Sequence, residues 1–257
     1  MFEQLENRSL LSASVFVDPQ TGVMTITGNA KAEHIDVQIN RDPATRGDVT
    51  RVRVYAEDQL VFKSTHSPGS LKRVEVFAGA GDDTVRVYND AADTRTVIHG
   101  EDGADTLEST IALAAPGSEV WGDSGDDVIA LADKLGATAG HFAQGGGGSD
   151  LIYGSNGADE LRGDFADSST ALDKSGNDTI FAAGGDDRLS GGDGDDVLNG
   201  QDGDDFIDAG QGSDIVDGGA GNDTATVDGQ DKVTGVEKID LVGPSLDLNG
   251  RVLNGLV

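Results

Sequence analysis

The chain contains no cysteine, which excludes disulfide bonds and thiolate metal ligands and leaves its redox compartment open. Its 257 residues include no apolar run long enough to cross a bilayer, so we expect no membrane insertion. Basic residues are scarce, with 18 Lys and Arg against 47 Asp and Glu. Nucleic acids and anionic membranes bind surfaces rich in Lys and Arg, so this balance argues against both as partners.

The acidic composition also bears on folding. A compact chain with a net charge of −29 repels itself, so we expect a positively charged ligand to be part of the folded protein. The 38 glycines and 36% hydrophobic content do not fit an ordinary helical or doubly wound domain. Intrinsic disorder is the alternative interpretation of such a composition. The regular placement of aliphatic residues favours a fold.

A nine-residue cycle repeats through the second half of the chain, with Gly at position 4, Asp at position 6 and usually an aliphatic residue at position 8. The copies are GGGGSDLIY from 145, GSNGADELR from 154, an interrupted copy from 163, AAGGDDRLS from 182, GGDGDDVLN from 191, GQDGDDFID from 200, AGQGSDIVD from 209 and GGAGNDTAT from 218.

The cycle has a simple structural explanation. Six residues with several glycines form a tight turn, because glycine takes φ > 0 without steric cost. The other three form a short strand, in which the side chain at position 8 points inward. Two cycles complete one turn of a flattened parallel coil, so each edge of the coil carries a row of Asp side chains. We expect one buried apolar column made of Ile152, Leu161, Ile180, Leu189, Leu198, Ile207 and Val216.

The rows of carboxylates predict a hard divalent cation between successive turns. Unpaired, such a row is repulsive, whereas an ion shared between turns makes it a source of stability. Calcium suits the pattern best, since it takes 6 to 8 oxygen ligands at about 2.3–2.6 Å in flexible geometry. Magnesium requires stricter octahedral order. Zinc would require His or Cys, which the repeat does not offer.

A looser form of the cycle occurs upstream, as AGAGDDTVR from 78, GEDGADTLE from 100 and GDSGDDVIA from 122. These copies start 22 residues apart, which predicts one such loop per turn, with an ordinary loop at the opposite edge. We expect one edge to stack the cycles that start at 78, 100, 122, 145, 163, 191 and 209. The other edge would stack those that start at 154, 182, 200 and 218.

The cycle resembles the calcium-binding nonapeptide G-G-x-G-x-D-x-U-x of the RTX (repeats-in-toxin) family. The resemblance implies an all-β fold, a right-handed parallel β-roll or β-helix solenoid that binds several Ca²⁺ ions. It also implies a chain that stays unfolded at low intracellular calcium, is exported, and folds outside the cell or on its surface.

The metal sites are expected at position 6 and position 4 of eleven cycles. The aspartates are Asp83, Asp105, Asp127, Asp150, Asp159, Asp178, Asp187, Asp196, Asp205, Asp214 and Asp223. The glycines are Gly81, Gly103, Gly125, Gly148, Gly157, Gly176, Gly185, Gly194, Gly203, Gly212 and Gly221.

The remaining segments set the expected organisation. Alternating apolar and polar residues over 15–77 predict a β-strand cap and the start of the solenoid. The segment GNAKAEHID from 28 fits the cycle, but Lys31 replaces the glycine, so we do not expect a metal there. One loop per turn is expected over 78–144, the nonapeptide β-roll over 145–226, and a C-terminal cap over 227–257. A type I secretion signal is the alternative reading of that last segment.

The first 14 residues carry no signal-peptide pattern. Leu5, Glu6, Arg8, Leu10 and Leu11 resemble the LEPR-XLL motif at the N-termini of planctomycete surface proteins, with Asn7 in place of the usual proline. A frayed tail is the alternative for this stretch.

Two further features point outward from the coil. Position 9 faces solvent, and Phe77, His99, Trp121 and Gln144 should form one column there. Exposed aromatic rings could hold a sugar or a protein partner, whereas stacking without a ligand is the simpler explanation. Tyr153 and Phe181 should be neighbours on the other sheet. Residues 165–174 interrupt one cycle and read as a tolerated surface loop, with a specific contact as the alternative.

No catalytic pattern is present. The sequence has no H-E-x-x-H or G-x-S-x-G motif, its four histidines are scattered and read as plain surface or strand residues, and the repeat already accounts for its carboxylate pairs. We therefore expect a monomeric, extracellular or cell-surface calcium-binding protein with a structural or interaction role, and no enzyme. The alternatives are a glycan- or cell-binding adhesin module and, less favoured, a polysaccharide-modifying enzyme.

Overall fold

The computed structural model describes residues 13–42, 49–67, 69–112, 115–134, 138–165 and 176–242. The N-terminal LEPR-XLL-like motif, most of the 165–174 insertion and the last part of the expected C-terminal cap lie outside these residues. The described part of the chain contains strands and no helix. Within it, no helix has the length and apolarity needed to cross a membrane.

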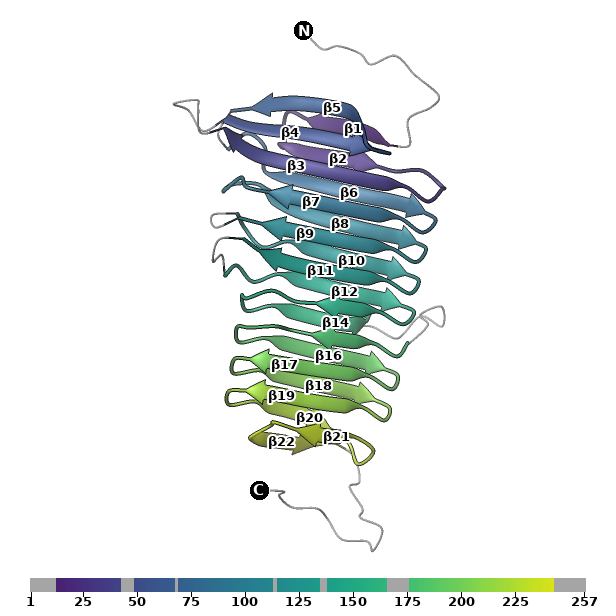
Figure 1. The fold of residues 1–257 in the computed structure, drawn as a ribbon, viewed down its shortest axis with the longest axis vertical. Helices are drawn as coiled ribbons and strands as arrows, with labels where there is room; N and C mark the ends of the chain where they lie inside the picture. The colour runs from purple at the N-terminus through teal and green to yellow at the C-terminus, as the bar shows by residue number, and fades with distance from the viewer. Residues whose placement is uncertain are drawn as a thin grey trace, which may run out of the picture.

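The strands form two eleven-stranded sheets that face each other along one long coil (Figure 1). From β6 onward the chain alternates between the sheets, so that each turn of the coil adds one strand to each. The first sheet has the order β1 (Ser14–Asp18), β2 (Val23–Thr27), β6 (Arg73–Ala80), β8 (Arg95–Asp102), β10 (Glu119–Ser124), β12 (Phe142–Gly147), β14 (Glu160–Asp164), β16 (Arg188–Asp193), β18 (Phe206–Gln211), β20 (Thr224–Val227) and β22 (Lys238–Leu241). The second has the order β21 (Lys232–Thr234), β19 (Ile215–Ala220), β17 (Val197–Asp202), β15 (Thr179–Phe181), β13 (Leu151–Tyr153), β11 (Val128–Asp133), β9 (Thr106–Ile111), β7 (Thr84–Asn89), β3 (His34–Asp42), β4 (Val49–Ala56) and β5 (Gln59–His66).

The strand register confirms the expected coil periods. In the nonapeptide region Leu189 pairs with Ile207, so each turn there contains two nine-residue cycles. Upstream, Ile98 pairs with Val120, which gives one longer turn and one glycine-rich loop per turn. The pairs are parallel in both regions, as a coil that always runs in one sense requires. The all-β parallel β-roll inferred from the spacing is therefore confirmed.

The core is the apolar column expected from position 8. All seven expected side chains are buried, with Leu189 the most exposed at 2%. Alternate residues of each strand point into the space between the sheets, and neighbouring turns place them in contact along the coil. Burial of these stacked side chains stabilises the coil along its whole length and fixes the position of each loop relative to the next.

The coil starts within residues 15–77. Within the 15–77 region, β2 already pairs in parallel with β6, and β3 with β7. Three antiparallel strands then close the N-terminal end, since β1 pairs with β2 in one sheet and β4 and β5 extend the other beyond β3. At the other end β21 and β22 add one more parallel turn after residue 226.

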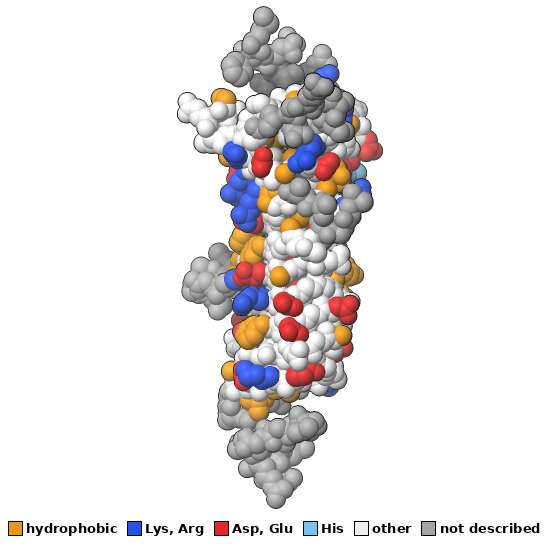
Figure 2. All heavy atoms as spheres, turned by 90° about the vertical axis from the view of Figure 1, so that its left-hand side faces the viewer, with side chains coloured by type: hydrophobic (Ala, Val, Ile, Leu, Met, Phe, Trp, Pro, Cys, Tyr) orange, Lys and Arg blue, Asp and Glu red, His pale blue; other side chains and the backbone are white. Residues whose placement is uncertain are grey.

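Charge is unevenly distributed along the coil. Residues 1–77 contain 9 basic and 10 acidic residues, whereas residues 78–257 contain 9 basic and 37 acidic ones. The space-filling view shows the same trend, with basic side chains gathered toward the N-terminal end and acidic ones spread over the rest (Figure 2). The excess negative charge therefore belongs to the repeat region.

Candidate metal centres

The position-6 aspartates form two columns, one on each edge of the coil, and hydrogen bonds connect each column internally. The main-chain N–H of Asp105 donates to Oδ1 of Asp127, and that of Asp127 donates to Oδ1 of Asp150, at 2.7 and 2.8 Å. The same bond repeats from turn to turn in both columns. The first column is Asp83, Asp105, Asp127, Asp150, Asp178, Asp196 and Asp214. The second is Asp159, Asp187, Asp205 and Asp223. The stacking order expected from the sequence is thus confirmed on both edges.

These bonds use only one oxygen of each carboxylate. In ten of the eleven predicted aspartates Oδ2 is buried and has no hydrogen-bond partner, which is costly for a charged oxygen unless something else binds it. The ten are Asp83, Asp105, Asp127, Asp150, Asp178, Asp187, Asp196, Asp205, Asp214 and Asp223.

For six of these free oxygens, a main-chain carbonyl oxygen of the next turn lies beside the same position-1 glycine; the six belong to Asp105, Asp127, Asp178, Asp196, Asp205 and Asp223. A Cβ built on Gly122 would lie 2.5 Å from the carbonyl oxygen of Gly145 and closer still to Oδ2 of Asp127. The same arrangement surrounds Gly100, with the carbonyl oxygen of Gly122 at 2.6 Å and Oδ2 of Asp105 beside it. The absent side chain therefore lets oxygens of two successive turns come close to one glycine. Carboxylate and main-chain carbonyl oxygens are the ligand types that calcium takes.

The free carboxylates are electrostatically unfavourable in the folded chain. Burial, together with repulsion from neighbouring carboxylates, raises the pKa of Asp127, Asp178 and Asp187 to about 8. The same causes raise the pKa of Asp150 and Asp196 to about 7. These aspartates therefore favour protonation or a bound cation over a bare charge near neutral pH.

The ligand set must be mixed. Within the described part of the chain, no three His, Cys, Asp or Glu side chains converge on one metal-sized site. A calcium ion between two turns would therefore take carboxylate oxygens from the aspartates and the rest of its ligands from main-chain carbonyls or water. Hard oxygen donors of this kind suit calcium and do not suit zinc.

The position-4 glycines serve chiefly to let successive turns approach each other. A Cβ on Gly212 would collide with the carbonyl of Gly194 in the previous turn, and the same holds for Gly103 against Gly81. Nine of the eleven predicted glycines also have φ between 117° and 159°, a region that other residues avoid. Gly157 and Gly176 are the two exceptions. Metal ligation by the carbonyl groups of these glycines stays a prediction.

Asp159 differs from the other ten aspartates. Its Oδ1 accepts the main-chain N–H of His141, and its Oδ2 accepts the N–H of Ser155 at 2.7 Å, so neither oxygen is free. Ser155 stands at position 2 of its cycle. In most other cycles the residue at position 2 has a positive φ, whereas Ser155 does not. We therefore leave Asp159 out of the proposed ligand set.

Both columns continue beyond the residues found by the nonapeptide pattern. Glu33 precedes Asp83 in the first column, donating its N–H to Oδ1 of Asp83 at 2.6 Å across 50 residues of chain. At the other end Asp231 follows Asp214, and Glu237 follows Asp223 in the second column. The sequence indicated Glu33, because the segment GNAKAEHID from 28 follows the nine-residue cycle and has Glu33 at position 6. Asp231 and Glu237 lie outside any repeat, so the sequence did not indicate them.

His141 occupies the place in the second column before Asp159. It is buried, its Nδ1 accepts the N–H of Ser118, and its Nε2 lies 3.4 Å from Oδ1 of the buried Asp133. The expectation that all histidines are plain surface or strand residues is wrong for this one. At the start of the second column, one place before Asp159, the side chain is therefore the imidazole of His141, where the rest of the column has aspartates. Its Nδ1 is bonded to the main chain.

Phe77, His99 and Trp121 form the outward column as expected, and their rings stack on one another, but Gln144, expected in the same column, is buried at 4% exposure. The ring centroids of Phe77 and His99 lie 4.9 Å apart and those of His99 and Trp121 5.9 Å apart, with nearly parallel planes. Trp121 packs in turn against Phe142. Ring faces that contact each other are not open to a sugar, so the simpler explanation, stacking without a ligand, agrees with this geometry. Tyr153 and Phe181 also stack, at 5.6 Å.

Comparison with known proteins bears on the repeat region. A family model described as the RTX calcium-binding nonapeptide repeat (4 copies) matches residues 142–168, 170–198 and 190–225. No match was found among the curated proteins or among the solved structures. The match, the parallel coil and the columns of buried aspartates agree on one chemistry. The chain carries an array of RTX calcium-binding nonapeptide repeats, which form a β-roll that binds several Ca²⁺ ions.

Proposed function

We propose that calcium drives the folding of this β-roll and that the ions lie between successive turns along both edges. The observation that carries the proposal is the set of ten buried Oδ2 atoms without a hydrogen-bond partner. Bound calcium supplies the positive charge that these carboxylates need, so its binding free energy adds directly to the free energy of folding. Because the sites consist of residues from different turns, they form only when the coil does.

The upstream turns belong to the same proposal, although the family match begins at residue 142. Asp83, Asp105 and Asp127 have the same bonded Oδ1 and the same free Oδ2 as the aspartates of the repeat region. We therefore expect ions along 78–144 as well as along 145–226.

A role outside the cell follows from the dependence of folding on calcium. RTX repeats typically occur in secreted proteins and are typically structural, which agrees with a roll that is stable only where calcium is plentiful. We propose an extracellular or cell-surface protein that stays unfolded for export, at low calcium, and folds after it.

Far-UV circular dichroism of the full chain, with calcium and with EGTA, tests the folding proposal. We expect a β-sheet spectrum in calcium and a largely unfolded spectrum in EGTA, fully reversed when calcium is restored. Fluorescence of Trp121, the single tryptophan, gives an independent signal from the upstream turns. A chain that is equally rich in β-structure in both buffers at neutral pH would contradict the proposal.

A further inference from the structure

The outer face of the second sheet carries a row of polar side chains across its N-terminal strands. Strand register places Lys63 of β5 opposite Arg53 of β4, Arg53 opposite Gln38 of β3, Gln38 opposite Tyr88 of β7, and Tyr88 opposite Thr110 of β9. With strands about 4.8 Å apart, this row is roughly 19 Å long. It lies outside the calcium columns, which follow the edges of the coil.

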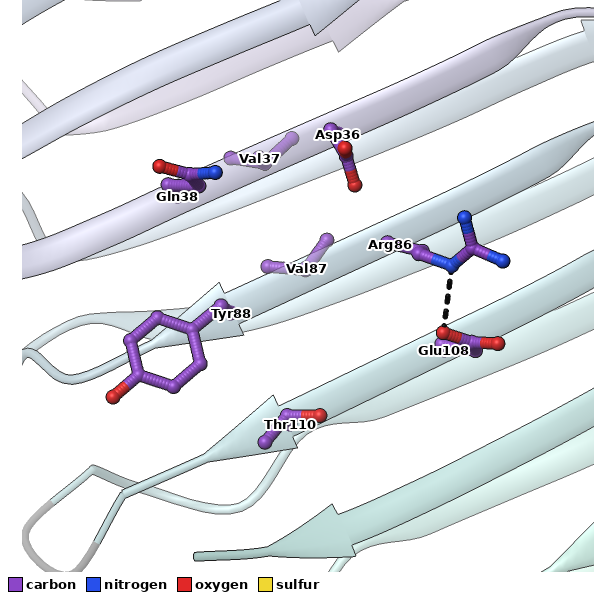
Figure 3. A pocket seen from close by; sticks show the side chains of 8 residues that line it. All are labelled: Asp36, Val37, Gln38, Arg86, Val87, Tyr88, Glu108 and Thr110. Atoms are coloured by element: carbon purple, nitrogen blue, oxygen red, sulfur yellow. Dashed lines mark hydrogen bonds and ion pairs between the residues drawn. The ribbon is translucent and has the colours of Figure 1, made fainter.

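Two shallow hollows lie along the row. One, of about 410 Å³, is lined by Arg51, Arg53 and Lys63 with the neighbouring Val52, Ser64 and Thr65. The other, of about 200 Å³, lies between β3, β7 and β9 (Figure 3). Figure 3 shows Gln38 and Tyr88 on one side of this hollow and the Arg86–Glu108 ion pair on the other. The two hollows, together called the groove here, have a cationic end and a polar end, where the carboxylates of Asp36 and Glu108 accompany Arg86.

The cationic end is short of negative charge. Within the described residues, neither Arg53 nor Lys63 has a carboxylate within ion-pair distance, whereas Arg86 is held by Glu108 at 2.8 Å. Like charges directly opposite on paired strands destabilise a sheet. In a chain with 47 acidic residues, a cation pair without a carboxylate is a feature that an anionic ligand would explain.

We propose that this groove binds an acidic polysaccharide, a glycan chain that carries carboxylate groups. A sugar carboxylate would receive charge-assisted hydrogen bonds from Arg53 and Lys63. The hydroxyl groups of adjoining sugars would meet Gln38, Tyr88 and Thr110, while Nζ of Lys134 lies over the Tyr88 ring, 4.8 Å from its centroid, and adds a further cation. The proposal goes beyond calcium binding and does not depend on which turns hold ions.

Nucleic acid is the other polyanion to consider, and the charge of the chain argues against it. DNA carries one charge per about 1.7 Å and needs many basic contacts. The groove offers only a few cations, beside a roll with a net charge of −28 over residues 78–257. A glycan with one carboxylate every second sugar has a much lower charge density and fits this arrangement better.

The test measures binding of a hyaluronan octasaccharide, which carries a carboxylate on alternate sugars, to the full chain in saturating calcium by isothermal titration calorimetry. An uncharged chitin oligosaccharide and a single-stranded oligonucleotide of similar length serve as comparison ligands. We expect binding of the hyaluronan probe, and weakening by about tenfold in the double variant Arg53→Gln/Lys63→Gln, since two charge-assisted hydrogen bonds are lost.

The control variant Arg188→Gln/Lys238→Gln removes the same charge from the outer face of the first sheet, and we expect it to bind like the unmodified protein. Circular dichroism and the number of bound calcium ions show that each variant is folded. Equal weakening by both variants, unchanged binding in the Arg53/Lys63 variant, tighter binding of the oligonucleotide, or no binding of the hyaluronan probe would each overturn the proposal.

Discussion

Each position-6 aspartate has two oxygens with different roles. Oδ1 accepts a main-chain N–H from the preceding turn and so helps hold the coil together. Oδ2 is buried and free in all cases except Asp159. The neighbouring position-5 residues behave differently, because they are exposed and several of them accept an N–H from the following turn, as Asp126 does from Ser149. Two adjacent aspartates of one loop are therefore separable by experiment.

Replacement of Asp127 by Asn should weaken calcium binding selectively. The amide can keep the Oδ1 hydrogen bond but removes the charge that a calcium ion needs. The loss of a direct ligand should cost at least the roughly tenfold in affinity that loss of an outer partner costs. In EGTA the variant should fold no less readily than the parent, since a buried charge has been removed. Calcium titration followed by circular dichroism measures both effects.

Asp126→Asn is the matched control, with the same change of charge one residue away. Asn177 occupies the equivalent position in another turn and accepts the corresponding N–H of Asp195, so the amide is compatible with this place. We expect its calcium midpoint to stay close to that of the parent. A similar shift in both variants would mean that net charge, and not a ligand at Asp127, governs the response.

At the scale of a single loop, the conformation at position 2 distinguishes the Asp159 cycle from most of the others. Glu101, Asp123, Ala183 and Gln201 all take positive φ there although none is glycine, a cost of order 1 kcal/mol or more for each. Ser155 does not, and its N–H reaches the Asp159 carboxylate instead. All the loops with positive φ at position 2 keep Oδ2 free. Asp164 lacks positive φ there and Oδ2 of Asp178 is still free, so it is the N–H contact from Ser155 that sets Asp159 apart.

Replacement of Ser155 by Gly should therefore create a calcium site. Glycine takes positive φ without cost, and the change removes the Ser155 hydroxyl, which bonds within the loop to Gly157 and Asp159. The carbonyl of Ala182 in the next turn is already in place beside Gly154. We expect one additional bound ion, counted by equilibrium dialysis with elemental analysis.

The control is Ser155→Ala, which removes the hydroxyl but not the preference against positive φ. It should bind the same number of ions as the parent protein. If Ser155→Gly also binds that number, the loop conformation does not govern ligation at Asp159.

At the scale of the whole molecule, the columns make folding depend on both calcium and protons. Raised carboxylate pKa values mean that the calcium-free folded chain binds more protons than the unfolded chain between about pH 4 and 8. The stability that these groups contribute is fully present below the unfolded pKa of about 4 and is lost as pH rises through the folded values of 7 to 8. Stability that calcium contributes depends on pH in the opposite way. It increases as pH rises, because calcium binds the ionised carboxylates.

In EGTA we therefore expect β-structure to appear as the pH is lowered from about 8 toward 5.5, where protons replace calcium as the positive charge. The calcium midpoint should rise over the same range, because protons compete for the same oxygens. Circular dichroism against pH, with and without calcium, measures both trends. A calcium-free chain that remains unfolded at the acidic end, while still soluble, would be inconsistent with buried carboxylates as the obstacle to folding.

The sequence by itself determined the repeat unit and its consequences. Gly at position 4 and Asp at position 6 specify a tight turn, and Ile180 or Leu198 at position 8 specifies a buried face, so the coil, its two edges and the order of the aspartates followed from local rules. The spacing of 22 residues likewise predicted one glycine-rich loop per upstream turn. These features depend on neighbours along the chain, which a periodic sequence repeats in every cycle.

Only the tertiary structure decided which carboxylates remain free and where the columns end. Asp159 belongs to a regular nonapeptide, yet the backbone at Ser155 satisfies both of its oxygens together with His141. Glu33 joins the first column across 50 residues because the β4 and β5 strands intervene. Hydrogen bonds between turns depend on the φ angle of one residue and on chain segments distant in sequence, and neither is encoded in the nine-residue pattern.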